Sequence, residues 1–339
     1  MRIKRSGVVI WTVSALALGL GVGGGAEVLE HGVVYHEPGR FAAWPANHGI
    51  WAWGDEILVG FAEATFLEKE DDHSFDRNKP FYNFLARSLD GGETWEARQA
   101  DWQGLGRPES ISYAIDFTHP DFALRARRAH YWVSFDRGRS WDGPYPFPDF
   151  GLDTELTART EYAVLGEDSC LAFLSAGDPA VKTAQNDRAF AIRTDDGGLT
   201  WKRSGWMTGY PYSVRSVMPA VVRLSEDAWL GLVRRRFDAH ERAQLGRMDL
   251  NWIDAVYSDN GGRNWRRRSL VAFTDLIHRN GNPPSAVRLD DGRIAVAYGF
   301  RGHPYGIRAK VSADNGKTWG HEIILRDDGR DYDLGYPRS

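Results

Sequence analysis

The chain is short of cysteine, of net charge and of low-complexity sequence, and each shortage excludes a class of protein. Cys170 is the only cysteine among 339 residues, so an internal disulfide is excluded and stability must come from packing. Its apolar neighbours in SCLAF predict a buried small side chain rather than a reactive thiol. The net charge of −4 provides no basic surface of the kind that binds nucleic acid, so no nucleic-acid partner is expected.

One long apolar run stands at the N-terminus. The chain begins with the basic segment MRIKRSG, continues with VVIWTVSALALGLGV, about 15 apolar or small residues, and reaches further small residues near Ala26. This pattern predicts a signal peptide over residues 1–26 and therefore a secreted or periplasmic protein. The alternative is an uncleaved anchor, but the run is short for a helix that spans a bilayer. No stable membrane span is expected after cleavage.

Glycine and tryptophan are abundant, and many of them belong to a repeat. The 37 glycines and 14 tryptophans favour an all-β protein rich in turns. An octet with the pattern S/T-x-D/N-x-G-x-S/T/N-W follows a strand-like run five times. The copies are SLDGGETW (Ser88–Trp95), SFDRGRSW (Ser134–Trp141), TDDGGLTW (Thr194–Trp201), SDNGGRNW (Ser258–Trp265) and SADNGKTW (Ser312–Trp319). Because Asp or Asn accepts bonds within a turn and Gly takes positive φ, each octet predicts a hairpin turn with a structural role.

The spacing of the octets indicates how the hairpins are assembled. Their tryptophans are about 46 to 64 residues apart, the length of a four-stranded sheet with its loops. Residues 221–236 (VVRLSEDAWLGLVRRR) also align without gaps on residues 286–301 (AVRLDDGRIAVAYGFR), and both predict a strand, a turn and a strand. Repeated sheets of this kind stack radially in a β-propeller. The fold expected is therefore all-β, with one propeller domain over residues 27–339.

The five octets resemble the Asp boxes of the sialidase (neuraminidase) superfamily of six-bladed β-propellers. The resemblance covers about residues 35–339, and RFAAWP and DLGYPRS are similar to segments of bacterial secreted members. It implies six blades, of which the last is expected to be incomplete, because the chain reaches only a few residues into its inner strand. Residues 32–38 (GVVYHEP) are expected to supply one strand of that blade.

The same resemblance implies an exo-α-sialidase that removes terminal sialic acid, or a related acidic sugar, from glycans. The family binds the carboxylate of the sugar with three arginines, attacks with a tyrosine and protonates the leaving group with an aspartic acid. No metal or other cofactor is implied, and the expected partners are sialylated or other acidic glycans. A lyase, or a glycosidase for another acidic sugar, would be a variant of this activity. The alternative from a different class is a catalytically silent propeller that binds acidic glycans.

The resemblance also places the acid. FAEATFLEKEDDHSF at residues 61–75 is similar to the acid-bearing segment of the family, which implies Asp71 as the acid/base, with Asp72 and His73 beside it in the substrate site. Asp72 is the alternative acid. A solvated acidic loop is the purely structural interpretation of the same segment.

Two tyrosines are candidates for the nucleophile. DYDLGYPRS contains Tyr332 and Tyr336, and by the internal alignment Pro337 matches Pro284 and Pro219 at the start of an inner strand. Since the family places its tyrosine at that start, Tyr336 is favoured. The structural alternative is an aromatic side chain packed at a strand start.

The three carboxylate-binding arginines are expected at Arg40, Arg236 and Arg301. Arg40 precedes the first inner strand, although the family has R-I-P where this chain has RFAAWP. Arg236 and Arg301 fill equivalent ends of the aligned strand pairs. The arginines close enough in sequence to substitute for them are Arg234, Arg235 and Arg308.

Two departures from the family weaken the match. The family has a glutamate at the start of the inner strand of blade four, where it draws the proton from the tyrosine, but SVMPAVVRL has no acid there. Glu241 in the following loop is the candidate replacement, and Glu63 is the alternative. The family also often has an arginine where this chain has Thr65.

Overall fold

The computed structural model describes residues 30–69, 72–102, 106–177, 187–209, 214–237, 250–275 and 281–339, together with three short strands before residue 30. The chain divides into two compact units, Met1–Gly106 and Arg107–Ser339. Its regular structure is almost entirely β, with one short 3-10 helix at Pro45–Asn47. None of the described helices has the length and hydropathy needed to cross a membrane.

The first unit contains one large antiparallel sheet. Its strands follow the order β5-β7-β8-β9, and β6 pairs with a different part of the long strand β7. The strands are β5 (Arg40–Ala43), β6 (Gly49–Trp53), β7 (Glu56–Thr65), β8 (Phe81–Ser88) and β9 (Glu96–Gln99). Two small sheets precede it, β1 (Ile10–Val13) with β4 (His31–Tyr35), and β2 (Leu16–Ala17) with β3 (Glu27–Val28).

The second unit contains four antiparallel sheets in which sequence neighbours are also neighbours in space. The first is β10 (Ala123–Arg127), β11 (His130–Ser134) and β12 (Asp142–Pro146). The second is β13 (Leu156–Val164), β14 (Cys170–Ala176), β15 (Arg188–Thr194) and β16 (Lys202–Trp206). The third is β17 (Val214–Arg223), β18 (Trp229–Phe237), β19 (Asn251–Ser258) and β20 (Arg266–Asp275), and the fourth is β21 (Pro284–Arg288), β22 (Ile294–Phe300), β23 (Gly306–Ser312) and β24 (Ile323–Arg326).

The described residues thus form five large sheets, as many as the complete blades expected, and the expectation of a sixth, incomplete blade is corrected. Residues 327–339, which follow β24, form no strand. Their polar groups bond elsewhere: the Tyr336 amide donates to Asn282 Oδ1, and the Ser339 and Ser285 hydroxyls share a hydrogen bond. Residues 32–38, expected to contribute to a sixth blade, include β4, which pairs with β1 in the first unit.

The Asp boxes lie where the sequence predicts, in the turn between the last two strands of each sheet. In the second sheet of the second unit, Asp196 accepts from the Thr200 amide at 2.9 Å and from the Thr200 hydroxyl at 2.5 Å. The Thr194 hydroxyl accepts from the Gly198 amide at 2.8 Å. Gly198 has a φ of +79°, which L side chains rarely adopt. The predicted structural role of the octets is confirmed.

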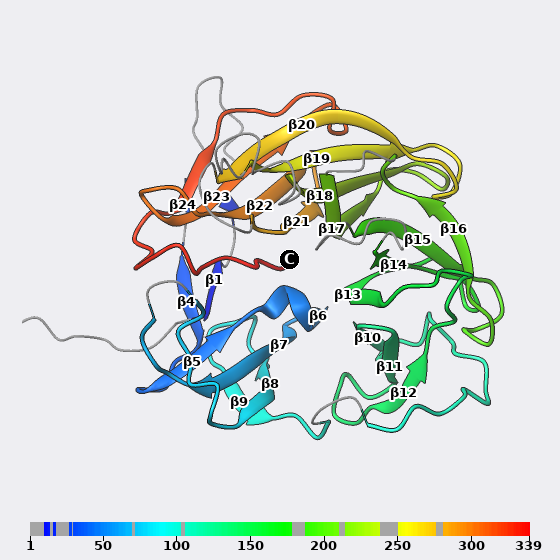
Figure 1. Cartoon of the computed structure of the whole chain (residues 1–339), viewed down its shortest axis with the longest axis horizontal. Helices are drawn as coiled ribbons and strands as arrows, with labels where there is room; N and C mark the ends of the chain where they lie inside the picture. The colour runs from blue at the N-terminus through cyan, green and yellow to red at the C-terminus, as the bar shows by residue number, and fades with distance from the viewer. Residues whose placement is uncertain are drawn as a thin grey trace, which may run out of the picture. The chain divides into compact units, whose positions relative to one another are not determined.

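The core of the second unit lies between successive sheets, because strand alternation sends side chains to both faces. On β14, Cys170 and Leu174 pack toward the first sheet, whereas Leu171 and Phe173 pack toward the third. Leu230, Leu232, Ile294 and Val296 belong to the cluster shared by the third and fourth sheets. Cys170 is fully buried as predicted, and burial raises the pKa of its thiol. The strands β13, β17 and β21, each the first strand of its sheet, lie beside the segment that follows β24 (Figure 1).

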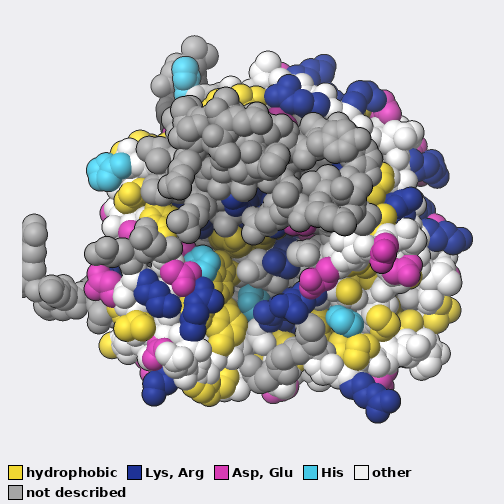
Figure 2. Space-filling view, viewed as in Figure 1, with side chains coloured by type: hydrophobic (Ala, Val, Ile, Leu, Met, Phe, Trp, Pro, Cys, Tyr) yellow, Lys and Arg dark blue, Asp and Glu magenta, His cyan; other side chains and the backbone are white. Residues whose placement is uncertain are grey.

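Charged side chains on the visible face are mixed in sign. Figure 2 shows Lys and Arg side chains beside Asp and Glu, without a continuous basic surface among the described residues. At the surface, Arg266 pairs with Asp259 and Arg293 pairs with Asp291. Ion pairs at the solvent-exposed surface contribute little to stability, so they do not hold the fold together.

Candidate active site

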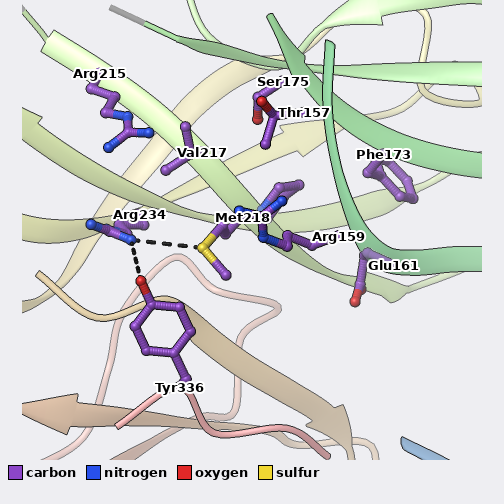
Figure 3. Close-up of a pocket in the computed structure, with 11 residues that line it drawn as sticks. Thr157, Arg159, Glu161, Phe173, Ser175, Arg215, Val217, Met218, Arg234 and Tyr336 are labelled. Carbon is purple, nitrogen blue, oxygen red and sulfur yellow. Dashed lines mark hydrogen bonds between the residues drawn. The ribbon is translucent and has the colours of Figure 1, made fainter. Parts of the chain in front are cut away.

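A polar pocket of about 100 Å³ lies in the second unit, where β13, β14, β17 and β18 meet the C-terminal segment. Figure 3 shows Tyr336 rising from the C-terminal segment toward side chains of these strands. The lining residues are Thr157, Arg159, Glu161, Phe173, Ser175, Arg215, Val217, Met218, Pro219, Arg234 and Tyr336. None of them belongs to an Asp box, so the octets and the pocket have separate roles.

Irregular strands direct polar side chains into this pocket. Along β13, Thr157, Arg159 and Glu161 alternate toward it, as side chains two apart do on one face of a strand. The pairing of β13 with β14 shifts register between Ala158 and Tyr162, so Arg159 and Glu161 lie in a bulge. A corresponding shift in β17 leaves Met218, with a φ of +51°, in a second bulge. Bulges often lie next to active sites, where they redirect a side chain.

Tyr336 has a strained backbone, which its surroundings maintain. Its φ of +63° is uncommon for a residue with a side chain. Its amide donates to Asn282 Oδ1 at 3.2 Å, and a Cβ on the preceding Gly335 would come within 2.1 Å of the same oxygen. Arg301 donates from Nη2 to the Leu334 carbonyl at 3.1 Å. Strain that neighbouring groups impose in this way is typical of functional sites.

The hydroxyl of Tyr336 lies among arginines. Arg234 Nη1 donates to Tyr336 Oη at 3.3 Å and also lies 3.7 Å from Met218 Sδ. Burial alone would raise the pKa of Tyr336, but the guanidinium groups of Arg234, Arg301 and Arg159 stabilise the phenolate, and the net result is a lowered pKa. Burial and the neighbouring Arg215 and Arg301 lower the pKa of Arg234 to about 10, which indicates that positive charge is concentrated here.

A partly buried glutamate anchors the segment that carries Tyr336. Glu161 accepts from the Val221 amide at 2.7 Å and pairs with Arg338 Nη1 at 2.6 Å. Burial raises the pKa of Glu161, and Arg338 and the Val221 amide reduce that rise without cancelling it. Glu161 therefore connects β13 both to β17 and to Arg338, which lies two positions after Tyr336.

Of the predicted site residues in the second unit, the structure brings Tyr336 and Arg301 together. Arg236 is buried in β18 opposite Arg215. The arginine that reaches Tyr336 is Arg234, which the sequence analysis gave as an alternative to the expected carboxylate-binding arginines. Arg308 donates to the Pro304 carbonyl and lies 4.8 Å from the centre of the Phe300 ring, so its guanidinium lies with that loop.

The described site residues predicted in the first unit have partners within that unit. Arg40 pairs with the buried Glu63 and donates to the Thr65 hydroxyl at 3.2 Å. Asp72 accepts from Arg77 at 2.8 Å, and the His73 ring lies 4.8 Å from the Trp44 ring. Asp71 and Glu241 lie outside the described residues. Because the two units are described separately, convergence of Asp71 and Arg40 on Tyr336 stays a prediction.

The SVMPAVVRL segment, which has no acidic residue, contributes Met218 to the pocket. Its thioether lies against Arg234 and cannot take a proton from a phenol. Within the described ranges, no carboxylate hydrogen-bonds to the Tyr336 hydroxyl. The lowered pKa of Tyr336 therefore rests on guanidinium groups rather than on a general base.

Arg159, Glu161 and Arg338 were not predicted from the sequence. The strand LTARTEYAV contains an alternating T-x-R-x-E pattern, which places three polar side chains on one face of a strand. That pattern was the available signal. The described residues contain no group of three or more His, Cys, Asp or Glu that could hold a metal ion.

Comparison with solved structures defines the class of fold. The structure is similar to a protein of unknown function from Dyadobacter fermentans DSM 18053, with a TM-score of 0.62, 23% identity, and coverage of 91% of this chain and 90% of that one. It is similar to a Penicillium chrysogenum alpha-L-arabinanase, with a TM-score of 0.54, 16% identity, and coverage of 83% and 81%. A Hadza microbial sialidase, Hz136, matches with a TM-score of 0.51, 13% identity, and coverage of 88% and 65%. At these identities the likeness shows the fold, which is that of sialidase-like β-propellers.

The sequence itself places the chain in a family. Residues 123–339 match the BNR repeat-like domain, and the chain belongs to that family. No curated protein matches the chain in sequence. The resemblance stated from the Asp boxes is thus confirmed for the repeat and for the fold.

Proposed function

We propose that this protein is an exported glycoside hydrolase that removes a terminal carboxylated sugar, and specifically an exo-α-sialidase with Tyr336 as nucleophile. The observation that carries the proposal is the Tyr336 hydroxyl, which Arg234 contacts at 3.3 Å and whose pKa nearby arginines lower. A lowered pKa activates a nucleophile that would otherwise be weak. The same guanidinium groups match the geometry and charge of a carboxylate.

In the proposed reaction, Arg234 and Arg301 bind the carboxylate on the anomeric carbon. Tyr336 loses its proton to solvent, and its phenolate oxygen, which the guanidinium groups stabilise, attacks that carbon. The bond from the carbon to the aglycone oxygen breaks, and the departing oxygen takes a proton from Asp71. Water then gives a proton to the Asp71 carboxylate and displaces the Tyr336 phenolate from the tyrosyl–sugar intermediate, and the two displacements together retain the anomeric configuration. Because Arg234 and Arg301 are buried, water screens their attraction to the carboxylate only weakly.

Export belongs to the same proposal. The apolar run of residues 8–22, preceded by the basic segment of residues 1–7, supports a signal peptide over residues 1–26. A signal peptide would deliver the protein to a compartment in which terminal sugars of glycans are accessible.

The proposal is tested with three fluorogenic glycosides that carry the same phenolic leaving group: an α-sialoside, a β-glucuronide and an α-L-arabinofuranoside. We expect the sialoside to be cleaved fastest and NMR to show the α-anomer as the first product. Cleavage of the arabinofuranoside alone would contradict a carboxylate-binding pocket. An inverted first product would contradict a tyrosyl intermediate.

The second candidate function is a silent propeller that binds acidic glycans. Met218 favours it, because this side chain offers no base where the sialidases have a glutamate. A protein that binds sialyl-lactose in calorimetry but hydrolyses none of the three glycosides would support this alternative.

A further inference from the structure

The sheet next to the Tyr336 pocket brings additional arginines to its edge. Strand β10 lies beside β13, and side chains of the β13 bulge complete its edge: Thr160 Oγ1 accepts from the Ala126 amide at 3.1 Å. Tyr162 Oη accepts from the Leu124 amide at 3.4 Å. Arg127 follows Ala126, and Arg159 precedes Thr160, so the two arginines occupy adjoining positions on neighbouring strands.

The turn after β10 is fixed to the same place. The Arg128 amide donates to the Ala158 carbonyl at 3.2 Å, and the Ala158 amide donates to the Arg128 carbonyl at 2.8 Å. Arg159 Nη1 donates to that same Ala158 carbonyl at 2.8 Å and also lines the pocket of Tyr336. Arg159 lines the pocket, and Arg127 and Arg128 occupy the adjoining positions on the neighbouring strand and its turn. We call these three residues the edge arginines.

Like charges are packed together among the edge arginines. Burial lowers the pKa of Arg159, and Arg127, Arg215 and Arg128 lower it further, while Tyr336 opposes them. Burial and Arg128 lower the pKa of Arg127. An anion that enters between the edge arginines would relieve this repulsion in a partly dry site, where charge attraction is strong.

We propose that the edge arginines form a second anion subsite, so that the preferred substrate has an anionic group on the sugar next to the terminal acidic sugar. This rests on the proposed function, because it assumes that the terminal sugar occupies the Tyr336 pocket. A carboxylate or a sulfate fits the chemistry equally, since both accept paired N–H bonds from guanidinium groups. The subsite would select between glycans with one charge and glycans with two.

The test uses three glycans: sialyl-lactose with one charge, disialyl-lactose with a second carboxylate, and sialyl-lactose sulfated on galactose. Both hydrolysis rates and calorimetric dissociation constants are measured for the wild-type chain and for Arg127→Gln and Arg159→Gln. We expect at least one doubly charged glycan to be favoured about tenfold over sialyl-lactose, since 1.4 kcal/mol, about the strength of one charge-assisted hydrogen bond, corresponds to a factor of ten. Each substitution should reduce that preference to about one to threefold.

The matched control is Arg203→Gln, which changes an exposed arginine on β16 and should leave the preference as it is in the wild-type chain. Favouring of the disialyl form identifies a carboxylate in the subsite, and favouring of the sulfated form identifies a sulfate. Hydrolysis of all three glycans at equal rates and with equal affinities would overturn the subsite and leave the proposed function standing. Tighter binding of a doubly charged glycan without hydrolysis would support the subsite and reject the glycosidase. Neither hydrolysis nor any binding preference would overturn both.

Discussion

In each Asp-box turn the acidic or amide side chain finds its partners within four residues of the chain, whereas the hydroxyl of Tyr336 meets Arg234 across 102 residues. The acceptors of the turns are satisfied locally: Asp136 accepts from the Ser140 amide and hydroxyl, and Asp314 does the same with Thr318. The polar side chains of the pocket meet only when β13, β17, β18 and the C-terminal segment come together. The turns are therefore local structural features, whereas the pocket is a chemical site assembled from distant parts of the chain.

The two regions also differ in electrostatics. Hydrogen bonds from a turn outweigh the opposing effect of burial and lower the pKa of Asp314 to about 2, so the charge of this aspartate is stabilised where it stands. In the pocket, guanidinium groups lower the pKa of a tyrosine and of one another. Backbone and hydroxyl groups stabilise the charge of the aspartate in the turn, whereas guanidinium groups stabilise the tyrosine phenolate in the pocket.

The largest expected effect belongs to Tyr336→Phe. Removal of the hydroxyl deletes the nucleophile and keeps the ring, so kcat on an aryl sialoside should fall by at least about 10³-fold while the melting temperature changes little. Tyr332→Phe is the control, since Tyr332 is the other tyrosine of the same segment and should stay within a few-fold of wild type. Loss of activity in Tyr332→Phe with retention in Tyr336→Phe would reverse the assignment.

Next in size is Arg234→Lys, which keeps the charge and removes the planar fork. The loss of a contact to a buried carboxylate typically costs about 2–5 kcal/mol, or roughly 30- to several-thousand-fold in kcat/KM. Arg235→Lys is the matched control, because Arg235 is directed to Asp254, 3.7 Å away, rather than to Tyr336. Steady-state kinetics of both variants on one sialoside decides the point. Equal losses in the two would mean that β18 itself is disturbed.

A smaller effect, on stability alone, is expected at an Asp box. Asp196→Ala removes the acceptor for the amide and hydroxyl of Thr200, and should reduce the free energy of unfolding by about 1–2 kcal/mol without changing kcat. Asp195→Ala changes the neighbouring aspartate, whose partner Arg193 lies at the surface, and should cost less than about 1 kcal/mol. Urea denaturation measures both. A loss of activity in Asp196→Ala at unchanged stability would contradict the claim that the turns are structural and the pocket alone is chemical.

The smallest expected effect is the pH dependence of one turn. The folded-state pKa of Asp314 is about 2, below the value in the unfolded chain, so its charge contributes stability above the unfolded pKa. That contribution is lost as the pH falls through the folded pKa. Asp314→Asn keeps an acceptor of the kind that Asn260 provides in the fourth box. The difference in melting temperature between wild type and variant should shrink between about pH 5 and pH 2.5, and a constant difference would contradict the assignment.

The sequence was sufficient for the turns because their partners are close along the chain. S-x-D-x-G-x-T-W contains the acceptor, the glycine and the donors of one hairpin, so the pattern predicted both the turn and its structural role. The internal alignment of Pro337 with Pro219 and Pro284 likewise favoured Tyr336, which the structure places in a pocket lined by arginines.

The remainder of the pocket depends on features that no short pattern encodes. Arg234 and Arg236 lie on the same face of β18, so the sequence alone does not show which of them reaches Tyr336. The adjacent strand has a bulge at Met218, and Arg234 contacts Met218 there. Arg159 and Glu161 occupy a second bulge, in a strand outside the aligned repeat. The number of blades could not be fixed either, since residues 327–339 bond to the first strands rather than begin a new sheet.

The central claim is that Tyr336 forms a covalent bond to the sugar. A sialosyl fluoride with a second fluorine on the adjacent carbon would form the intermediate and slow its hydrolysis, because the electron-withdrawing fluorine destabilises a cationic transition state. After incubation with this reagent and proteolysis, mass spectrometry should find the added sugar on the peptide that contains Tyr336, at one equivalent per chain. An active protein that releases fluoride from the reagent and has the sugar on another residue, or on none, would contradict the account.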